Sequence, residues 1–112
     1  MEIKDGFCVD VFFDESMKFI GKKKDEPFFV YLATNVPHGP TAVLKEWLKP
    51  YENQDIRGGN AYGSTKEHFA TITRFDQNLG RLRQFLAKNN LEDNTILIFL
   101  TDNGSARGAH TF

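Results

Sequence analysis

The sequence has little cysteine, no excess of charge and no long hydrophobic run. Its single cysteine, Cys8, excludes an internal disulfide. The 14 Lys and Arg residues nearly balance the 15 Asp and Glu residues, and the net charge of −1 argues against a nucleic-acid-binding protein that works by bulk electrostatics. The longest apolar runs, 28–33 and 96–100, are far shorter than the roughly 20 residues that span a bilayer. No signal-peptide pattern is present. We therefore expect neither a nucleic-acid nor a membrane partner.

Common catalytic motifs are also missing. The sequence contains no Gly-x-Gly-x-x-Gly, no Walker-type phosphate loop, no Gly-x-Ser-x-Gly and no Cys-x-x-Cys. Because Cys8 has neither a glycine-rich turn nor a nearby base, we expect a packed, inert thiol. What is present is ordinary for a globular chain: 112 residues, 40% hydrophobic and 26% charged, which is room for one domain.

Two helices are predicted from apolar periodicity. The first covers 10–23, with Asp10 as its N-cap. The second covers 65–88, and Ser64 and Glu67 have the spacing of a capping box at its start. At about 1.5 Å per residue, this second helix would be about 36 Å long. The apolar stripes consist of Val9, Phe13, Met17 and Ile20 in the first helix, and of Phe69, Ile72, Phe75, Leu79, Leu82 and Leu86 in the second.

Two continuous apolar runs predict β-strands that are buried on both faces. Residues 28–33 and 95–100 are apolar almost throughout and rich in aromatic and β-branched side chains. Residues 49–63, by contrast, are expected to have no regular secondary structure. A long crossover that contains a helix joins the two strands, so we expect a parallel pair with a right-handed connection, the core of an α/β sandwich. Two strands alone do not make a stable parallel sheet, and eleven Phe residues are much apolar surface for so few elements. The chain is therefore expected to be a segment of a larger protein or to pair with another copy.

Polar residues follow each predicted strand, at the edge where open parallel sheets bind ligands. His38 comes after the first strand, on a loop with two prolines, and could contact an anionic substrate or protonate a leaving group. Asp102 and Asn103 come after the second strand, and their oxygen atoms suit Ca²⁺ or Mg²⁺. The alternatives are a surface histidine in the first case and a simple Asp-Asn-Gly turn in the second.

Three segments of the chain follow one another in this order: PFFVYLATNVPHGP at 27–40, DQNLGRL at 76–82 and LEDNTILIFLTDNG at 91–104. They resemble, respectively, the "PFF-Y-A--PH-P" segment, the "D-N-GR-L" helix signature and the "GL-DNTIVIFTSDNG" segment of arylsulfatases. The resemblance implies an alkaline-phosphatase-like α/β fold and hydrolysis of sulfate esters. It further implies that residues 1–112 are an internal segment of a sulfatase catalytic domain.

The resemblance also implies roles for individual residues. His38 would contact the sulfate and help with the leaving-group proton, and Asp102 and Asn103 would ligate a divalent metal, usually Ca²⁺ or otherwise Mg²⁺. The family's nucleophile is a formylglycine made within Cys-x-Pro-Ser-Arg. That motif is absent here, and Cys8 does not match it. We therefore expect formylglycine in the parent protein, no nucleophile in this chain, and no sulfatase activity from the chain alone.

The implied substrate is a sulfated small molecule or glycan that the parent protein binds. Sulfatases are typically exported, to the periplasm, the extracellular space or the lysosome, and any signal peptide would lie upstream of Met1. Exposed aromatic surface would favour self-association of the isolated chain. Two alternatives stay open: a metal-dependent phosphodiesterase or phosphatase of the same superfamily, and a non-catalytic interaction module.

Overall fold

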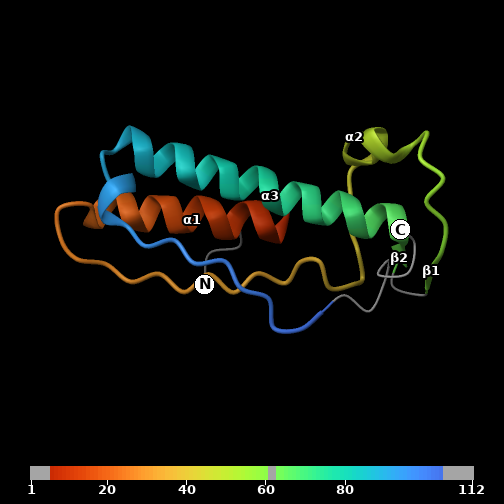
Figure 1. Ribbon diagram of the computed structural model, residues 1–112, viewed down its shortest axis with the longest axis horizontal. Helices are drawn as coiled ribbons and strands as arrows, with labels where there is room; N and C mark the ends of the chain where they lie inside the picture. The colour runs from red at the N-terminus through yellow and green to blue at the C-terminus, as the bar shows by residue number, and fades with distance from the viewer. Residues whose placement is uncertain (1–5, 61–62, 105–112) are drawn as a thin grey trace. The chain divides into compact units, whose positions relative to one another are not determined.

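The computed structural model describes residues 6–60 and 63–104 of the chain (Figure 1). The elements in order are α1 (Cys8–Lys23), α2 (Lys45–Leu48), the 3-10 turn η1 (Lys49–Tyr51), β1 (Gly59–Asn60), β2 (Gly63–Ser64), α3 (Thr65–Lys88) and the 3-10 turn η2 (Glu92–Asn94). The chain forms two compact units. The first contains residues up to Asn35 together with Phe75–Thr95, and the second contains Val36–Arg74 together with residues from Ile96 on.

In the first unit, α1 lies beside the C-terminal part of α3 (Figure 1). The Phe13 ring is 1% exposed and meets the Phe75 ring edge-on, with 5.4 Å between centroids. Further along both helices, Gly21 lies beside the Phe85 ring. Because the contacts run in the same order along both helices, α1 and α3 are parallel here. The buried apolar residues of this unit are Val9, Phe13, Ile20, Leu82 and Leu86.

The predicted helices are confirmed, but the start of the first one is not. Helix α3 covers 65–88, as the capping box and the periodicity predicted. Helix α1 begins at Cys8, and its N-cap is Phe7, without a side-chain cap. Asp10 as N-cap is therefore wrong, because its carboxylate accepts a hydrogen bond from Asn78 instead.

The expected packing of Cys8 is also wrong. The residue is exposed on the first turn of α1. Its neighbour Val9 is buried. At about 3.6 residues per turn, successive side chains of a helix point about 100° apart. A residue next to the apolar stripe therefore need not share its burial.

A polar network crosses between α1 and α3. Asn78 is fully buried, and its Nδ2 donates to Asp10 Oδ1 at 2.6 Å. Its Oδ1 accepts from Arg81 Nη1 at 2.6 Å. Arg81 Nη2 also pairs with Asp14 Oδ1 at 2.6 Å, but both of these side chains are about half exposed, so that pair adds little on its own. The buried Asn78 thus connects Asp10 on α1 with Arg81 on α3.

Replacing Asn78 by alanine is expected to lower the free energy of unfolding by about 2–3 kcal/mol, because hydrogen bonds to charged groups are lost and buried polar atoms lose a partner. Urea denaturation of the variant measures the loss. The matched control is Gln84→Ala, an exposed amide on the same helix, which should change the stability by less than about 0.5 kcal/mol. Equal effects of the two substitutions would contradict a stabilising role for the network.

In the second unit, α2 and η1 pack against the first turns of α3. The Tyr51 ring lies 6.1 Å from the Phe69 ring, and the Tyr51 hydroxyl hydrogen bonds with the Thr73 hydroxyl. The guanidinium carbon of Arg74 lies 5.0 Å from the centre of the Trp47 ring, a cation–π contact. These contacts hold the start of α3 in place.

The region expected to be irregular also contains a small β-hairpin ladder. Strands β1 and β2 pair antiparallel, with Gly59 opposite Ser64 and Asn60 opposite Gly63. Strand β2 leads directly into α3. The prediction of a wholly irregular segment over 49–63 is therefore wrong.

The predicted strands at 28–33 and 95–100 form no ladder among the described residues, where β1–β2 makes up the one sheet. In the first segment exposure alternates, with Phe29 at 85% and Tyr31 at 84%, while Phe28, Val30 and Leu32 are half-buried. In the second segment every residue from Ile96 to Leu100 is exposed. Burial on both faces requires neighbouring strands and covering helices, and the described chain offers these segments no strand to pair with. The predicted parallel pair is thus not confirmed, and burial of these segments on both faces is wrong for this chain.

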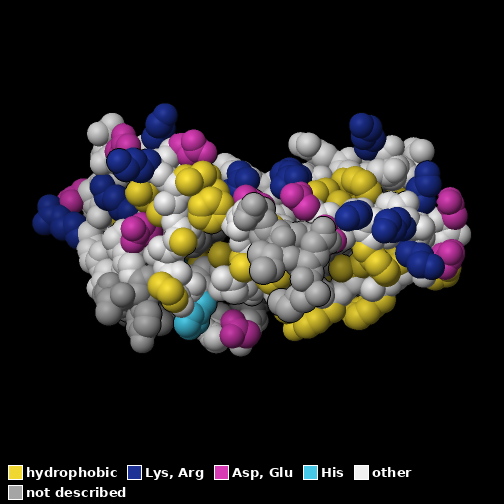
Figure 2. Space-filling view, turned by 180° about the vertical axis from the view of Figure 1, so that it is seen from behind, with side chains coloured by type: hydrophobic (Ala, Val, Ile, Leu, Met, Phe, Trp, Pro, Cys, Tyr) yellow, Lys and Arg dark blue, Asp and Glu magenta, His cyan; other side chains and the backbone are white. Residues whose placement is uncertain are grey.

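Large apolar side chains consequently remain at the surface. Figure 2 shows hydrophobic side chains reaching the surface of one face, among acidic and basic ones. No helix in the described ranges is both long and apolar enough to cross a membrane.

Candidate active-site segments

His38 lies in a turn between Pro37 and Pro40 and is exposed. Its Nδ1 is 2.6 Å from the Gly39 carbonyl oxygen. Since a carbonyl oxygen only accepts hydrogen bonds, Nδ1 must carry the proton and donate it. This fixes the orientation of the ring and leaves Nε2 as the nitrogen available to a ligand. A protonated ring could then donate from Nε2 to an anion or to a leaving-group oxygen.

Asp102 and Asn103 lie in an exposed bend after the second apolar segment. Their carboxylate and amide oxygens are the hard donors that Ca²⁺ and Mg²⁺ take, but Ca²⁺ takes about six to eight oxygen ligands. Over the described ranges, no group of three or more His, Cys, Asp or Glu side chains is placed to hold a metal ion. The donors are thus of the right chemical kind but too few for a complete site.

The structure does not show the predicted meeting of the two clusters. His38, Asp102 and Asn103 all belong to the second unit, but within the described part of the chain no hydrogen bond or ion pair joins His38 to the other two. Their convergence was expected from a parallel sheet whose strands end at one edge. Because that sheet is not formed among these residues, the convergence stays a prediction.

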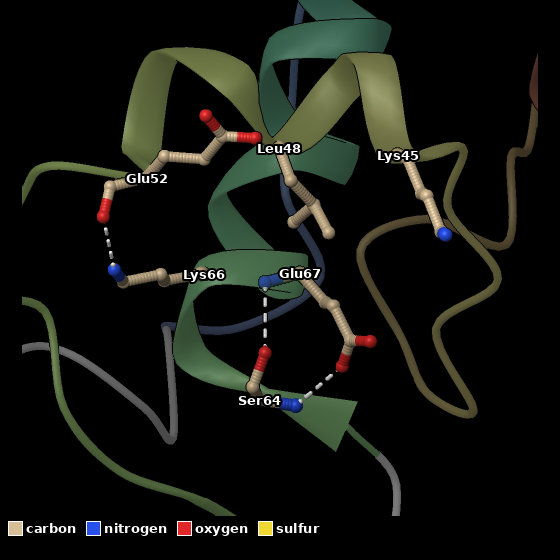
Figure 3. A pocket seen from close by; sticks show the side chains of 6 residues that line it. All are labelled: Lys45, Leu48, Glu52, Ser64, Lys66 and Glu67. Atoms are coloured by element: carbon tan, nitrogen blue, oxygen red, sulfur yellow. Dashed lines mark hydrogen bonds between the residues drawn. The ribbon is translucent and has the colours of Figure 1, made fainter.

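A hollow of about 350 Å³ lies elsewhere in the second unit, at the start of α3 (Figure 3). Lys66 Nζ donates to the Glu52 carbonyl oxygen at 3.1 Å, across one side of it. The lining holds two lysines and two glutamates, so their charges cancel and do not favour a sulfate ion. The residues that line it are Lys45, Leu48, Glu52, Ser64, Lys66 and Glu67. None of them is a site residue predicted from the sequence.

The capping box predicted from the sequence lies at the edge of this hollow (Figure 3). Glu67 N donates to Ser64 Oγ at 3.2 Å, and Ser64 N donates to Glu67 Oε2 at 2.6 Å. The two bonds satisfy backbone N–H groups that a helix start otherwise leaves open. Sequence reasoning identified these residues as a helix start, but it missed the close approach of Thr41 to Gly63 beside them. The only local signal for that approach is the glycine itself.

Comparison with known proteins matches residues 5–112 to the family described as Sulfatase. The chain belongs to the sulfatase family. It is 33% identical over 103 residues to the uncharacterized sulfatase YdeN of Escherichia coli, covering 89% of this chain and 17% of that protein. It is 32% identical over 101 residues to the N-acetylgalactosamine-6-O-sulfatase of Bacteroides thetaiotaomicron, covering 90% and 17%. It is 28% identical over 97 residues to the human N-acetylgalactosamine-6-sulfatase, covering 86% and 16%.

The chain thus spans about a sixth of the length of these sulfatases. Membership in the sulfatase family confirms the family resemblance predicted from the sequence. The sulfatase family implies an alkaline-phosphatase-like α/β fold for the whole protein. In the described part of this chain, helices and one short hairpin are formed, and the sandwich is not.

Proposed function

We propose that this chain is an internal segment of the catalytic domain of a sulfatase that hydrolyses sulfate esters. The observation that carries the proposal is the match to the sulfatase family over residues 5–112. The substrate we infer is a sulfated small molecule or glycan, and two of the similar proteins, named as N-acetylgalactosamine 6-sulfatases, support the glycan. Such enzymes are typically exported, so we infer a periplasmic, extracellular or lysosomal location, which cell fractionation tests.

In this proposal His38 acts on the leaving group. As the sulfur forms a bond to the nucleophile, cleavage of the ester S–O bond leaves negative charge on the departing oxygen, and a proton from Nε2 of the imidazolium neutralises it. The bond from Nδ1 to the Gly39 carbonyl supports this role, because it holds the ring with Nε2 available. The imidazole that results is neutral, and it regains its proton from water.

Asp102 and Asn103 would supply two oxygen ligands to a divalent cation, Ca²⁺ or Mg²⁺, whose remaining ligands lie elsewhere in the whole sulfatase. Such an ion would offset the negative charge of the sulfate oxygens. The nucleophile, a formylglycine in this family, would likewise come from outside this chain, because the Cys-x-Pro-Ser-Arg motif is absent. The chain would thus contribute a proton donor and part of a metal site.

The purified 112-residue chain is expected to release no sulfate from aryl or sugar sulfates, because it lacks the nucleophile. The longer sulfatase that carries this segment should release it. Sulfate release by both proteins, with and without millimolar Ca²⁺, measures the difference, and the melting temperature shows whether Ca²⁺ binds the folded state. Sedimentation of the short chain checks for self-association through its exposed apolar side chains, such as Phe29 and Ile96.

Two outcomes would contradict the proposal. Sulfate release by the short chain alone would show that a nucleophile lies within it. Hydrolysis of phosphate esters but not sulfate esters by the longer protein would favour the phosphodiesterase or phosphatase alternative instead.

A further inference from the structure

The side chain of Thr41 packs against the backbone of Gly63, where β2 leads into α3. A Cβ built on Gly63 would overlap Thr41 Oγ1, and would lie 3.3 Å from Thr41 Cβ and 3.0 Å from Glu67 Oε2. Real Cβ atoms essentially never overlap another atom as this one would overlap Thr41 Oγ1, and the other two distances are tighter than most real Cβ contacts. Gly63 also has φ of +135°, a conformation that side chains of L residues rarely adopt. Both the space and the backbone therefore require glycine at this position.

The surface that Thr41 contacts is well anchored. Glu67, whose carboxylate lies beside Thr41 on the same side of Gly63, is tied to Ser64 by the two capping-box bonds (Figure 3). Helix α3 begins directly after Ser64, at Thr65, and Tyr51 holds its first turns through Phe69 and Thr73. The start of α3 thus forms a rigid support for the chain at Thr41.

Thr41 is three residues after His38, and the connection between them is short, consisting of Gly39 and Pro40. Pro37 and Pro40 have restricted φ angles because of their rings. The His38 ring is tied to this same backbone by the bond from Nδ1 to the Gly39 carbonyl. A displacement of Thr41 would therefore be transmitted to the imidazole. All of these residues belong to the second unit, so no relation between the two units enters the argument.

We propose that Gly63 and Thr41 are positioning residues for His38. The absence of a side chain at Gly63 lets Thr41 sit directly on the start of α3, and this contact holds the His38 loop so that Nε2 stays at the position where the leaving group departs. This inference rests on the proposed function for the role of His38, but the contact itself concerns only the 112-residue chain.

The test uses Gly63→Ala and Thr41→Ala, with Thr41→Ser as the conservative variant and Gly80→Ala as the matched glycine control. A Cβ at Gly80 would meet no atom within 4 Å. Two properties are measured. The first is the NMR signal of the His38 imidazole in this chain labelled at its histidines, with His38→Gln to assign it. The second is kcat and KM for sulfate release by the longer sulfatase.

We expect Gly63→Ala and Thr41→Ala to shift the His38 signal and to lower kcat by about ten- to hundredfold with KM changed by less than about threefold, because a displacement of about 1 Å at a reacting group costs on the order of 10²-fold. Thr41→Ser and Gly80→Ala should match the wild type in both measurements. The double variant Gly63→Ala/Thr41→Ala should be no worse than Gly63→Ala alone, because removing the Thr41 side chain removes the overlap.

An unchanged His38 signal in both single variants would overturn the inference, whatever the activity. Fully additive losses in the double variant would also overturn it, since the two residues would then act independently. If Gly63→Ala fails to fold, the His38 signals of Thr41→Ala and Thr41→Ser still test whether Thr41 positions His38. If the signals shift as expected but the longer wild-type protein releases no sulfate, the proposed function fails, while the positioning of His38 by this contact is supported.

Discussion

Replacement of His38 by alanine in the longer sulfatase is expected to lower kcat for sulfate-ester hydrolysis by about 10²- to 10⁴-fold, the range of general acid catalysis by a positioned side chain. The reason is that Nε2 would no longer protonate the departing oxygen. Steady-state kinetics of sulfate release measure the loss. The matched control is His68→Gln. His68 is half-buried on α3, and no role in the site is proposed for it, so its replacement should change kcat by less than about threefold.

The leaving group offers a sharper version of this experiment. An activated aryl sulfate releases a weakly basic phenolate that needs little help from a proton, whereas a sugar sulfate releases a strongly basic alkoxide. The loss caused by His38→Ala should therefore be much larger for a sugar sulfate than for a nitrophenyl sulfate. An equal loss for both substrates would show that His38 contacts the sulfate without donating the proton. An unchanged kcat for both substrates would show that His38 has no role in the reaction.

Replacement of Phe13 by alanine is expected to lower the free energy of unfolding by about 3–5 kcal/mol, the usual cost of truncating a buried Phe. Phe13 is 1% exposed and its ring meets Phe75 edge-on, so both the burial of the ring and an aromatic contact are lost. The measurement is urea denaturation of the 112-residue chain, monitored by circular dichroism. Because small domains are only marginally stable, loss of the cooperative transition altogether would also agree with this expectation.

Two further variants serve as controls for Phe13. Phe19 lies on the same helix but is 45% exposed, and its replacement by alanine should cost about 1–1.5 kcal/mol. Phe13→Leu keeps most of the volume and should cost less than about 1.5 kcal/mol. Equal losses for Phe13→Ala and Phe19→Ala would contradict a core between α1 and α3.

The helices were predictable because their signals are local. The capping box of Ser64 and Glu67 and the apolar period that follows predicted α3 over 65–88, and the structure has these bounds. The start of α1 was mispredicted at Asp10 because the N-cap rule considers neighbours in sequence alone. Asp10 is instead bonded to Asn78, 68 residues away. The buried amide of Asn78 on another helix binds the Asp10 carboxylate. The residues near Asp10 in the sequence give no indication of this contact.

The strands predicted at 28–33 and 95–100, unlike the helices, depend on residues far away in the chain. The composition of 28–33 and 95–100 indicates strands buried on both faces, but a strand is defined by its hydrogen bonds to a neighbour. No ladder forms on either segment in the described chain, so Phe29, Tyr31 and Ile96 stay exposed. The same dependence applies to the site, because the expected meeting of His38 with Asp102 relies on that sheet.

By itself, the sequence determined the family through three segments in order, the extent of α3, and the residue types that suit sulfate-ester chemistry, His38, Asp102 and Asn103. Each of these depends on residues close together in the chain. Only the tertiary structure decided that Asn78 is a buried link to α1, and that Thr41 rests on Gly63. Those contacts join residues more than 20 positions apart, and they form because two distant surfaces fit in space, a property that no local spacing of residues encodes.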